Sequence, residues 1–291
     1  MKLKRSLKQK KINMRLSIEK VSKNFTAQHG KVLALDEISI QIKEGEFICF
    51  VGPSGCGKTT LLNMVAGLET PTKGVVRQSG EEIKIPSSDR VVIFQEAALF
   101  PWLNVIQNVE FGLVRRMNVR KRREISRTFL NLVHLGRFEN AYVHQLSGGM
   151  KSRVAIARAL ALNPSILLMD EPFAALDAQT RDILHEEIEE IWFQTKQTIV
   201  FVTHNVREAV RLGDRVFVFT ARPGRIKKEF QIALPRPRDT NSESVVLYAK
   251  LIQQELREEI EKFLKEEVDR DWSLKKANLL RPAGIDLGSG I

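Results

Sequence analysis

One segment decides how this chain must fold, and it reads Gly52-Pro53-Ser54-Gly55-Cys56-Gly57-Lys58-Thr59. It fills every fixed position of the pattern G-x-x-x-x-G-K-[ST]. A strand-like apolar run over 47–51 precedes it, and a helix-compatible run over 60–66 follows it. In such a turn, backbone N–H groups converge at a helix N-terminus and stabilise an anion. The segment therefore predicts a phosphate-binding loop, with Lys58 on the β- and γ-phosphates and the Thr59 hydroxyl on Mg²⁺. A glycine-rich turn without a ligand is the less favoured alternative.

The composition indicates one large domain, or a main domain with an appendage. The chain has 291 residues, of which 43% are hydrophobic and 28% are charged, as in an ordinary globular protein. No apolar run approaches the ~18–20 residues of a membrane-spanning helix, and no stretch of secretory-signal length follows the basic N-terminus. We therefore expect a cytosolic protein that is attached to a membrane only through a partner.

The net charge and the cysteine content do little to narrow the possible functions. The net charge is +11, and six basic residues lie among the first eleven. Such a tail is usually a solvated segment, although it could also touch anionic lipid headgroups or nucleic acid. The two cysteines, Cys49 and Cys56, have no metal-ligand spacing and do not suggest a disulfide framework.

Strand-like and helix-like segments alternate in an order that predicts an α/β fold. Residues 16–50 alternate apolar and polar residues between turn signals, which indicates an antiparallel β region before the loop. Further strands are expected at 91–94, 166–169, 198–202 and 216–219, and helices at 100–165 and 178–194. This order argues for a parallel sheet with helices on its faces and for a helical insertion between two strands.

The C-terminal part predicts one amphipathic helix. Beyond Pro237-Arg238, apolar residues recur every three or four positions, at Tyr248, Ile252, Leu256, Ile260 and Phe263/Leu264. This face would pack against the body or bind a partner. The expected domains are a basic tail at 1–15, a main domain at 16–240 with a helical subdomain at about 96–165, and a helical extension and tail at 241–291.

An acidic pair, Asp170 and Glu171, follows the strand expected at 166–169. Ligands bind at this edge of open α/β sheets. Asp170 is placed to hold Mg²⁺ and its waters. Glu171 points elsewhere, and it can accept a hydrogen bond from a water aimed at the γ-phosphate, as a general base or a positioning group. A solvated strand end would be the favoured interpretation if the phosphate-binding loop were not present upstream.

A second anion site is indicated by Ser147-Gly148-Gly149, which opens a helix expected at 151–162. Free N–H groups, a hydroxyl and the helix dipole favour an anion there, although Ser-Gly-Gly is also a common turn and N-cap. One chain does not need two γ-phosphate sites for one nucleotide. The economical explanation is that this site caps the ATP held by a second subunit.

With these motifs in this order, the chain resembles the nucleotide-binding subunit of an ATP-binding-cassette (ABC) transporter over roughly residues 16–240. The resemblance implies a P-loop NTPase core of ABC type: a mainly parallel sheet with flanking helices, an N-terminal antiparallel β subdomain and an inserted helical subdomain. It also implies an ATPase that uses ATP and Mg²⁺. The family's signature reads Leu-Ser-Gly-Gly-Gln, whereas this chain has Met150 at its end and Ser152 where a glutamine is usual.

The resemblance also assigns roles to individual residues. The residues implied to bind ATP are Phe25, Gly52, Pro53, Ser54, Gly55, Cys56, Gly57, Lys58, Thr59 and Thr60. Phe25 takes the place of the aromatic that stacks on adenine, where the family often has Tyr. The implied metal set is Thr59, Gln95 and Asp170, and the implied catalytic set is Glu171, His204 and Gln95.

Three of these assignments depend wholly on the resemblance. Gln95 would sense Mg²⁺ and the attacking water, and its loop would link to the membrane subunit. His204 resembles the switch histidine that contacts the γ-phosphate, and Asp177 looks like part of the dimer-contact loop. The other histidines are expected to be structural: His29, His134, His144 and His185.

Several segments are similar to the branch that imports nitrate, alkanesulfonates, taurine and related solutes: 100–105, 221–226, 234–239 and the Met150 position. Phe100 and Trp102 would either receive a membrane subunit or pack the helical insertion. The implied partners are a second ATPase subunit, membrane permease subunits and, indirectly, a solute-binding protein. The implied location is the cytoplasmic face of the cell membrane.

Two other functions are less favoured. A soluble ABC ATPase acting on nucleic acid is mildly favoured by the basic tail, but the chain has no long coiled coil between loop and signature and no second cassette. A kinase or GTPase with a phosphate-binding loop is disfavoured because no guanine-reading Asn-Lys-x-Asp segment is present. The cargo itself is not encoded in this chain.

Overall fold

The structure is a computed structural model, and it describes residues 14–27, 30–174 and 176–279. Most of the basic tail (1–13) and the end of the C-terminal extension (280–291) lie outside the described residues. The first strand begins at Met14, so the tail expected at 1–15 overlaps the β region by two residues.

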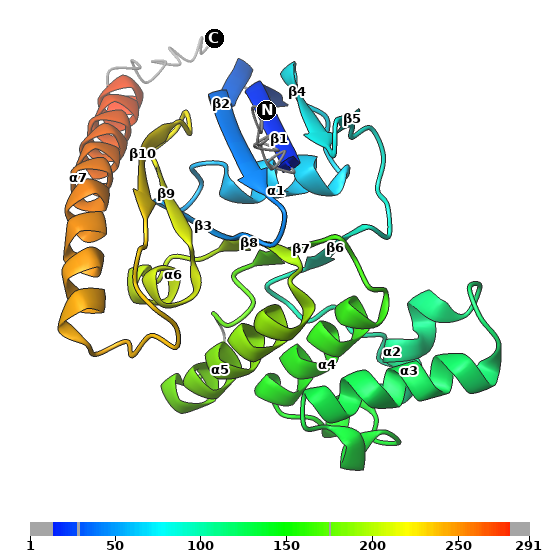
Figure 1. The fold of residues 1–291 in the computed structure, drawn as a ribbon. Helices are drawn as coiled ribbons and strands as arrows, with labels where there is room; N and C mark the ends of the chain where they lie inside the picture. Colours follow the sequence, from blue (N-terminus) through cyan, green and yellow to red (C-terminus); the bar gives the residue numbers. More distant parts are fainter. Residues whose placement is uncertain (1–13, 28–29, 175, 280–291) are drawn as a thin grey trace, which may run out of the picture.

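A six-stranded sheet forms the centre, in the order β10-β9-β3-β8-β7-β6 (Figure 1). Its strands are β3 Phe47–Val51, β6 Arg90–Ile93, β7 Ile166–Asp170, β8 Thr198–Val202, β9 Arg215–Phe219 and β10 Ile226–Gln231. All neighbours run parallel except β9 and β10. The parallel core confirms the predicted α/β class, whereas the sequence analysis did not assign β10.

Burial on both faces explains why three strands read as unbroken apolar runs. Every residue of β3 and β8 is buried, as are the first four of β7. Alternate side chains of β3 enter two different hydrophobic cores. Phe47, Cys49 and Val51 pack in one core, and Ile48 and Phe50 pack in the other. Because successive side chains of a strand point to opposite faces, this alternation follows directly from the strand geometry.

The helices are divided between the two faces of the sheet. Helix α1 (Lys58–Ala66) lies above it in Figure 1, and α4 (Gly148–Ala161), α5 (Ala178–Thr195) and α6 (Val206–Leu212) lie below. The face with α1 is completed by a second, four-stranded antiparallel sheet in the order β2-β1-β4-β5. Its strands are β1 Met14–Ala27, β2 Gly30–Lys43, β4 Lys73–Gln78 and β5 Glu81–Glu82.

The segment between β6 and β7 is helical. It contains α2 (Val105–Glu110), α3 (Val119–Leu132), three short 3₁₀ turns and α4. The buried Asn108 side chain ties the preceding loop to α2, because its Oδ1 accepts a hydrogen bond from Phe100 N–H at 2.8 Å. Phe100 is half-buried against Phe111, with ring centroids 4.2 Å apart, while Trp102 is 70% exposed. The two aromatics therefore differ: Phe100 packs the insertion and Trp102 faces outward.

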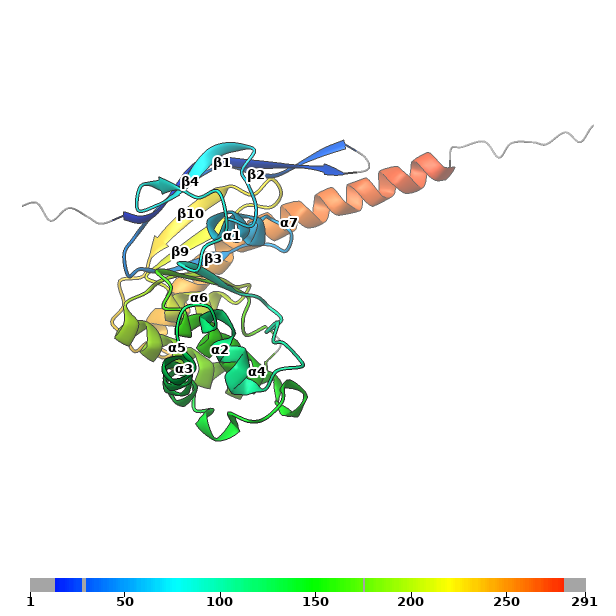
Figure 2. The same ribbon diagram turned by 90° about the vertical axis from the view of Figure 1, so that its right-hand side faces the viewer.

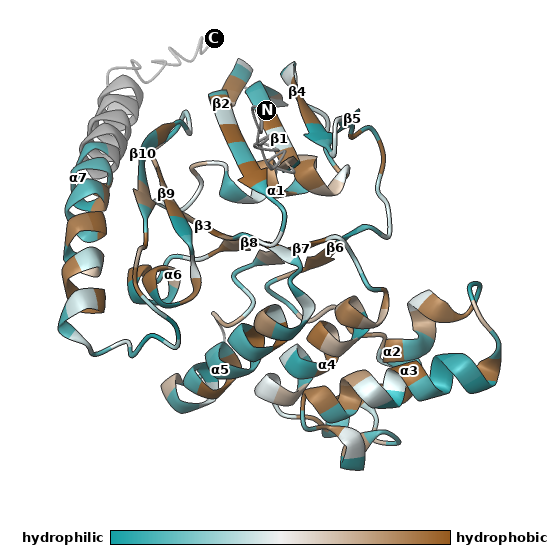
Figure 3. Ribbon diagram, viewed as in Figure 1, coloured by the Kyte–Doolittle hydropathy of each residue, from teal (hydrophilic) through white to brown (hydrophobic). Residues whose placement is uncertain are grey.

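Helix α7 (Glu243–Leu279) runs alongside β9 and β10 and continues past the body (Figures 1 and 2). Hydrophobic and hydrophilic residues alternate along the part of α7 that is coloured in Figure 3. Val245, Ala249, Ile252 and Leu256 are buried, but Ile260 is 44% exposed. The expectation that Ile260 belongs to the buried apolar face was therefore wrong. Glu259 occupies the buried position in that turn of the helix instead. The side chains of Phe263 and Leu264 lie outside the described residues.

Two properties of the described residues bear on location and chemistry. No described helix is both long and apolar enough to cross a membrane. Both cysteines are free and buried, and burial raises the pKa of the Cys49 thiol well above its ordinary value.

A buried arginine closes the main body before α7 begins. The guanidinium of Arg238 donates to five backbone carbonyls, those of Val210, Arg211, Gly213, Ile232 and Leu234. Burial lowers the pKa of Arg238 to about 10, so the side chain remains charged at neutral pH. The residue holds the C-terminal end of α6 to the strand-like segment that leads to α7.

We expect Arg238→Ala to lower the free energy of unfolding by about 3 kcal/mol or more, because several buried carbonyls lose a charged donor at once. Urea unfolding followed by circular dichroism measures this. The matched control is Arg257→Ala on α7, whose side chain is 82% exposed and pairs with Glu261. Its effect should stay within about 0.5 kcal/mol. Equal stability of the two variants would contradict the assigned role of Arg238.

Candidate nucleotide-binding site

The phosphate-binding loop lies between β3 and α1, as the sequence predicted. Gly57 has a positive φ of +99°, and α1 begins at the next residue, Lys58. A Cβ at position 57 would lie 2.6 Å from Leu35 Cδ2, so glycine is required both by backbone conformation and by space. The loop therefore turns tightly enough to direct N–H groups toward the start of α1.

The Lys58 ammonium folds back over the loop. Its Nζ donates to the carbonyls of Gly52 and Pro53, both at 2.8 Å, and it approaches Cys56 Sγ at 3.6 Å. Burial raises the pKa of the Cys56 thiol, and the nearby lysine lowers it only in part. Cys56 is thus a small buried residue of the loop and remains protonated at neutral pH.

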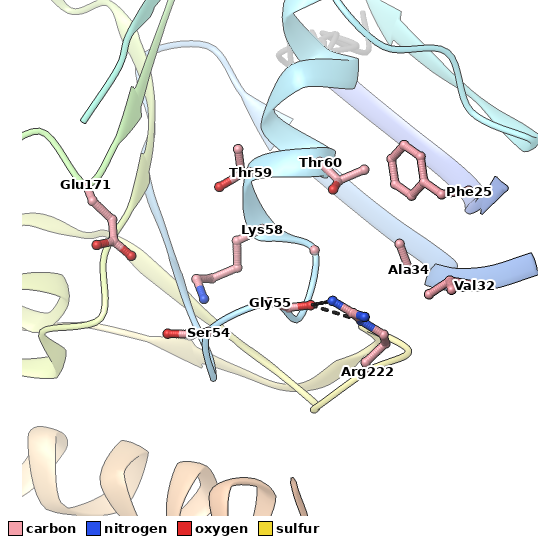
Figure 4. A pocket seen from close by; sticks show the side chains of 11 residues that line it. Phe25, Val32, Ala34, Ser54, Gly55, Lys58, Thr59, Thr60, Glu171 and Arg222 are labelled. Atoms are coloured by element: carbon pink, nitrogen blue, oxygen red, sulfur yellow. Dashed lines mark hydrogen bonds between the residues drawn. The ribbon is translucent and has the colours of Figure 1, made fainter. Parts of the chain in front are cut away.

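A pocket of about 450 Å³ opens beside the loop (Figure 4). Phe25 stands at one end and Glu171 at the other. Between them lie Ser54, Gly55, Gly57, Lys58, Thr59 and Thr60, all expected from the sequence. Phe25 is 39% exposed on β1, and Lys23 Nζ lies 5.1 Å from its ring centroid. A flat aromatic surface and a phosphate-type loop therefore share one cavity of ligand size.

Three residues of the pocket wall were not found by sequence reasoning: Val32, Ala34 and Arg222. Val32 and Ala34 lie on β2, which pairs with the strand that carries Phe25. Arg222 comes from the turn between β9 and β10, far along the chain. No local pattern marks these positions, because they reach the pocket only through strand pairing and tertiary packing.

Parallel pairing brings the loop and the acidic pair to the same edge of the sheet. Val202 of β8 lies opposite both Phe50 of β3 and Asp170 of β7. Burial raises the pKa of Asp170, a hydrogen bond from Thr59 lowers it in part, and the charge of Glu171 raises it again. The Thr59 hydroxyl and the Asp170 carboxyl are thus neighbours, whereas Gln95 is exposed in the bend after β6.

Glu171 and His204 face each other at this edge. Glu171 Oε2 lies 2.9 Å from His204 Nδ1, and Glu171 N–H donates to Val202 O at 2.9 Å. Glu171 has a φ of +45°, a left-handed conformation that is uncommon and strained for a non-glycine residue. Glu171 also lines the pocket, so its carboxylate lies where the pocket and the histidine meet.

A buried polar cluster supports the histidine loop. His185 Nε2 lies 2.6 Å from Glu208 Oε1, and the Thr203 hydroxyl donates to Glu208 Oε2. His185 and Glu208 are both almost fully buried. The cluster joins α5, α6 and the residue before His204, so His185 has the structural place that the sequence analysis expected.

The second predicted anion site lies at the N-terminus of α4. Ser147 caps this helix, with its Oγ accepting from Met150 N–H at 3.3 Å. Asp177 caps α5, accepting from Thr180 N–H at 3.0 Å, and this contact lowers the pKa of the Asp177 carboxyl. Gly149 packs so closely on Thr180 that a Cβ there would lie 2.6 Å from Thr180 Cγ2. The N-terminus of α4 and the first turn of α5 are therefore in close contact.

These two helix N-termini and the pocket are separate. Among the described residues that line the pocket, none belongs to Ser147–Gly149 or to Asp177. The pocket and the second predicted anion site therefore do not meet within the described chain.

Comparison with known proteins gives the family. The sequence profile described as ABC transporter matches residues 35–174. An uncharacterised ABC transporter ATP-binding protein of Methanocaldococcus jannaschii is 51% identical over 259 residues, which is 89% of this chain and 97% of that protein. The chain therefore belongs to the ABC transporter family, as an ATP-binding subunit with ATPase activity.

Further relatives and a solved structure belong to the same family. The nitrate import ATP-binding protein NrtD of Synechocystis is 46% identical over 228 residues, 78% of this chain and 86% of that protein. The aliphatic sulfonates import ATP-binding protein SsuB of Bacillus cereus is 46% identical over 231 residues, 79% and 91% of the two chains. A dimeric ATP-binding cassette bound to ADP and Pi matches with a TM-score of 0.68 and 33% identity, over 76% of this chain and 100% of that one.

We expect Gly57→Ala to weaken ATP binding about tenfold or more, because an alanine in this conformation is strained by about 1–2 kcal/mol and must also displace Leu35. Titration with a fluorescent ATP analogue measures the affinity. Gly80→Ala is the matched control, since Gly80 has a φ of +90° but no neighbour within 4 Å of its Cβ position. The same ATP affinity in both variants would refute the packing argument.

Proposed function

We propose that two copies of this chain, or this chain and a close homologue, bind two ATP molecules between them and power an importer. Each ATP lies between the phosphate-binding loop of one subunit and Ser147-Gly148-Gly149 of the other. The observation that carries this proposal is the separation of the two anion-binding elements within one chain. The dimeric form of the solved cassette that matches this fold supports it.

Nucleotide recognition is divided along the pocket. The Phe25 ring stacks on the adenine at one end of the pocket, and the residues from Gly52 to Thr60 surround the phosphates. Lys58 leaves its contacts with Gly52 and Pro53 and donates to the β- and γ-phosphates instead. An ammonium that already lies inside the loop needs only a side-chain rotation to reach them.

The residues present fit a magnesium ion. Thr59, Asp170 and Gln95 offer hydroxyl, carboxylate and amide oxygens, and Mg²⁺ takes such hard ligands together with phosphate oxygens. The influence of the Thr59 hydroxyl on the pKa of Asp170 supports this set, because it requires the two groups to be close neighbours. Bound Mg²⁺ would neutralise phosphate charge. Gln95 would join this set when its exposed loop moves inward.

Hydrolysis depends on Glu171. Its carboxylate faces the pocket and accepts a proton or a hydrogen bond from the water that attacks the γ-phosphate. His204 orients this carboxylate through their 2.9 Å contact and donates to a γ-phosphate oxygen. The strained backbone of Glu171 keeps this carboxylate apart from the one that holds the metal.

Closure of the ATPase dimer is the step that moves the attached permease subunits. ATP stabilises the closed arrangement because only that arrangement completes both sites, so binding shifts the population toward it. Asp177 lies beside the signature, where the partner subunit approaches. Hydrolysis removes the γ-phosphate contacts and lets the dimer open.

The transported solute is a small anion or metabolite such as nitrate, a sulfonate or taurine. Relatives named for nitrate import and aliphatic sulfonates import support this choice. The described chain has no membrane-spanning helix, so permease subunits form the path, and a solute-binding protein outside the membrane delivers the cargo. The chain works at the cytoplasmic face of the membrane. The structurally similar CbiO1 of Clostridium perfringens is part of an ABC transporter complex.

We expect Glu171→Gln to bind ATP with unchanged affinity, to lose at least about a hundredfold in turnover, and to dimerise when ATP is added, because the amide cannot activate water. Phosphate release and size-exclusion chromatography measure these properties. Glu190→Gln, an exposed position on α5, is the control and should behave as wild type.

Normal turnover of Glu171→Gln would remove its catalytic role. A variant that binds ATP but stays monomeric would contradict the shared site. Salt-sensitive binding of DNA or RNA by the wild-type chain, without stimulation by a permease, would favour the nucleic-acid function instead.

Trp102 is the residue we expect to contact the permease. Trp102→Ala should leave basal ATPase activity unchanged and reduce stimulation by the cognate permease in liposomes about fivefold, as for a buried aromatic anchor of an interface. Phe193→Ala is the matched control, because Phe193 is 66% exposed but lies near the C-terminal end of α5, outside the helical segment between β6 and β7 that contains Trp102. Full stimulation of the Trp102 variant would place the docking surface elsewhere.

A further inference from the structure

The turn between β9 and β10 is tightly built and lies directly against the phosphate-binding loop. Thr220 closes it: its N–H donates to Arg225 O at 3.0 Å and its hydroxyl to Pro223 O at 2.9 Å. Gly224 N–H donates to Ala34 O at 2.9 Å. A Cβ at Gly224 would lie only 2.0 Å from the backbone oxygen of Cys56. The turn therefore packs backbone against backbone beneath the loop.

Arg222 projects from this turn to the loop itself. Its Nη2 and Nε lie 3.1 and 3.4 Å from Gly55 O, as Figure 4 shows. In a trans peptide the carbonyl and the following N–H point in opposite directions. The N–H of the same peptide, that of Cys56, donates to Pro53 O at 3.4 Å within the loop. Arg222 therefore holds the carbonyl end of a peptide whose N–H end closes the loop on itself.

The same turn is held from behind by α7. Glu259 Oε2 accepts from Ala221 N–H at 3.2 Å, one residue before Arg222. Glu259 is almost fully buried, and its Oε1 lies 3.3 Å from Lys227 Nζ and 3.1 Å from Lys262 Nζ. Burial raises its pKa, but hydrogen bonds from Lys262 and Ala221 more than offset this and lower it, so the carboxylate is charged at neutral pH. Glu259 is the residue that is buried in the turn of α7 where the sequence pattern predicted Ile260 to be buried.

We propose that Arg222 and Glu259 are positioning residues for ATP, and that the C-terminal helix sets nucleotide affinity through them. Glu259 fixes the backbone of the turn, the turn directs Arg222, and Arg222 fixes the Gly55 peptide of the loop. Glu259 itself does not line the pocket. This inference rests on the proposed nucleotide site. It adds that α7 influences the affinity of that site for ATP, although α7 lies outside the family profile, which ends at residue 174.

The test uses the full chain and measures ATP affinity with a fluorescent analogue, together with KM and kcat for hydrolysis. We expect Arg222→Ala and Glu259→Ala each to raise Kd and KM for ATP about fivefold to tenfold, the loss typical of one charged hydrogen bond, with kcat within about twofold of wild type. Arg222→Lys should restore most of the affinity, because a lysine still donates to Gly55 O. Glu258→Gln is the matched control: Glu258 neighbours Glu259 on α7 and pairs with Lys227 at 2.7 Å, and it should bind ATP as wild type.

The double variant separates a shared pathway from two independent effects. If both residues act on the same peptide, Arg222→Ala with Glu259→Ala should bind ATP no more than about twofold weaker than Arg222→Ala alone. The inference would be overturned if the fold-losses of ATP affinity in the two single variants multiplied in the double variant. It would also be overturned if Glu259→Ala bound ATP with wild-type affinity. Unfolding of Glu259→Ala in thermal melts would make that residue purely structural and would also overturn it. Failure of the wild-type chain to bind ATP would instead contradict the proposed function.

Discussion

Parallel pairing of three buried strands is the constraint on which the whole site depends. Val202 of β8 stands beside Phe50 of β3 on one side and Asp170 of β7 on the other. The residues that follow these strands therefore emerge at one edge of the sheet, although more than a hundred positions separate β3 from β7 and β8 in the chain. A slip of one residue in β7 would exchange the side chains that it buries on its two faces and would shift the acidic pair relative to the phosphate-binding loop.

The parts of the site that were predictable are those encoded locally. The loop from Gly52 to Thr59 combines turn glycines with its own flanking strand and helix, so one short window contains the whole signal. Ser147 was recognisable for the same reason, since it caps a helix whose start it marks. Asp177 also caps a helix, but only the family resemblance pointed to it. The central strands β3, β7 and β8 were found because burial on both faces leaves them continuously apolar.

What sequence reasoning missed is determined by tertiary packing. Strand β10 has no buried residue and contains three successive charged ones, so it lacks an apolar pattern and is ordered by pairing with β9. Arg222 has the appearance of a surface arginine until the β9–β10 turn is placed under the loop. Arg238 and Glu259 break the usual rule that charged residues stay outside, and both are buried only because several partners surround them. None of these partners could be identified without the fold.

The burial of both cysteines has a practical consequence for spectroscopy. Cys49 and Cys56 are the chain's only thiols, and burial raises the pKa of each. Maleimide reagents react with accessible thiolates, so the native chain offers them almost no background. A single cysteine introduced on an exposed turn could carry a fluorophore or a spin label without prior removal of the natural ones. Distances between two labelled copies could then be followed while nucleotide is added.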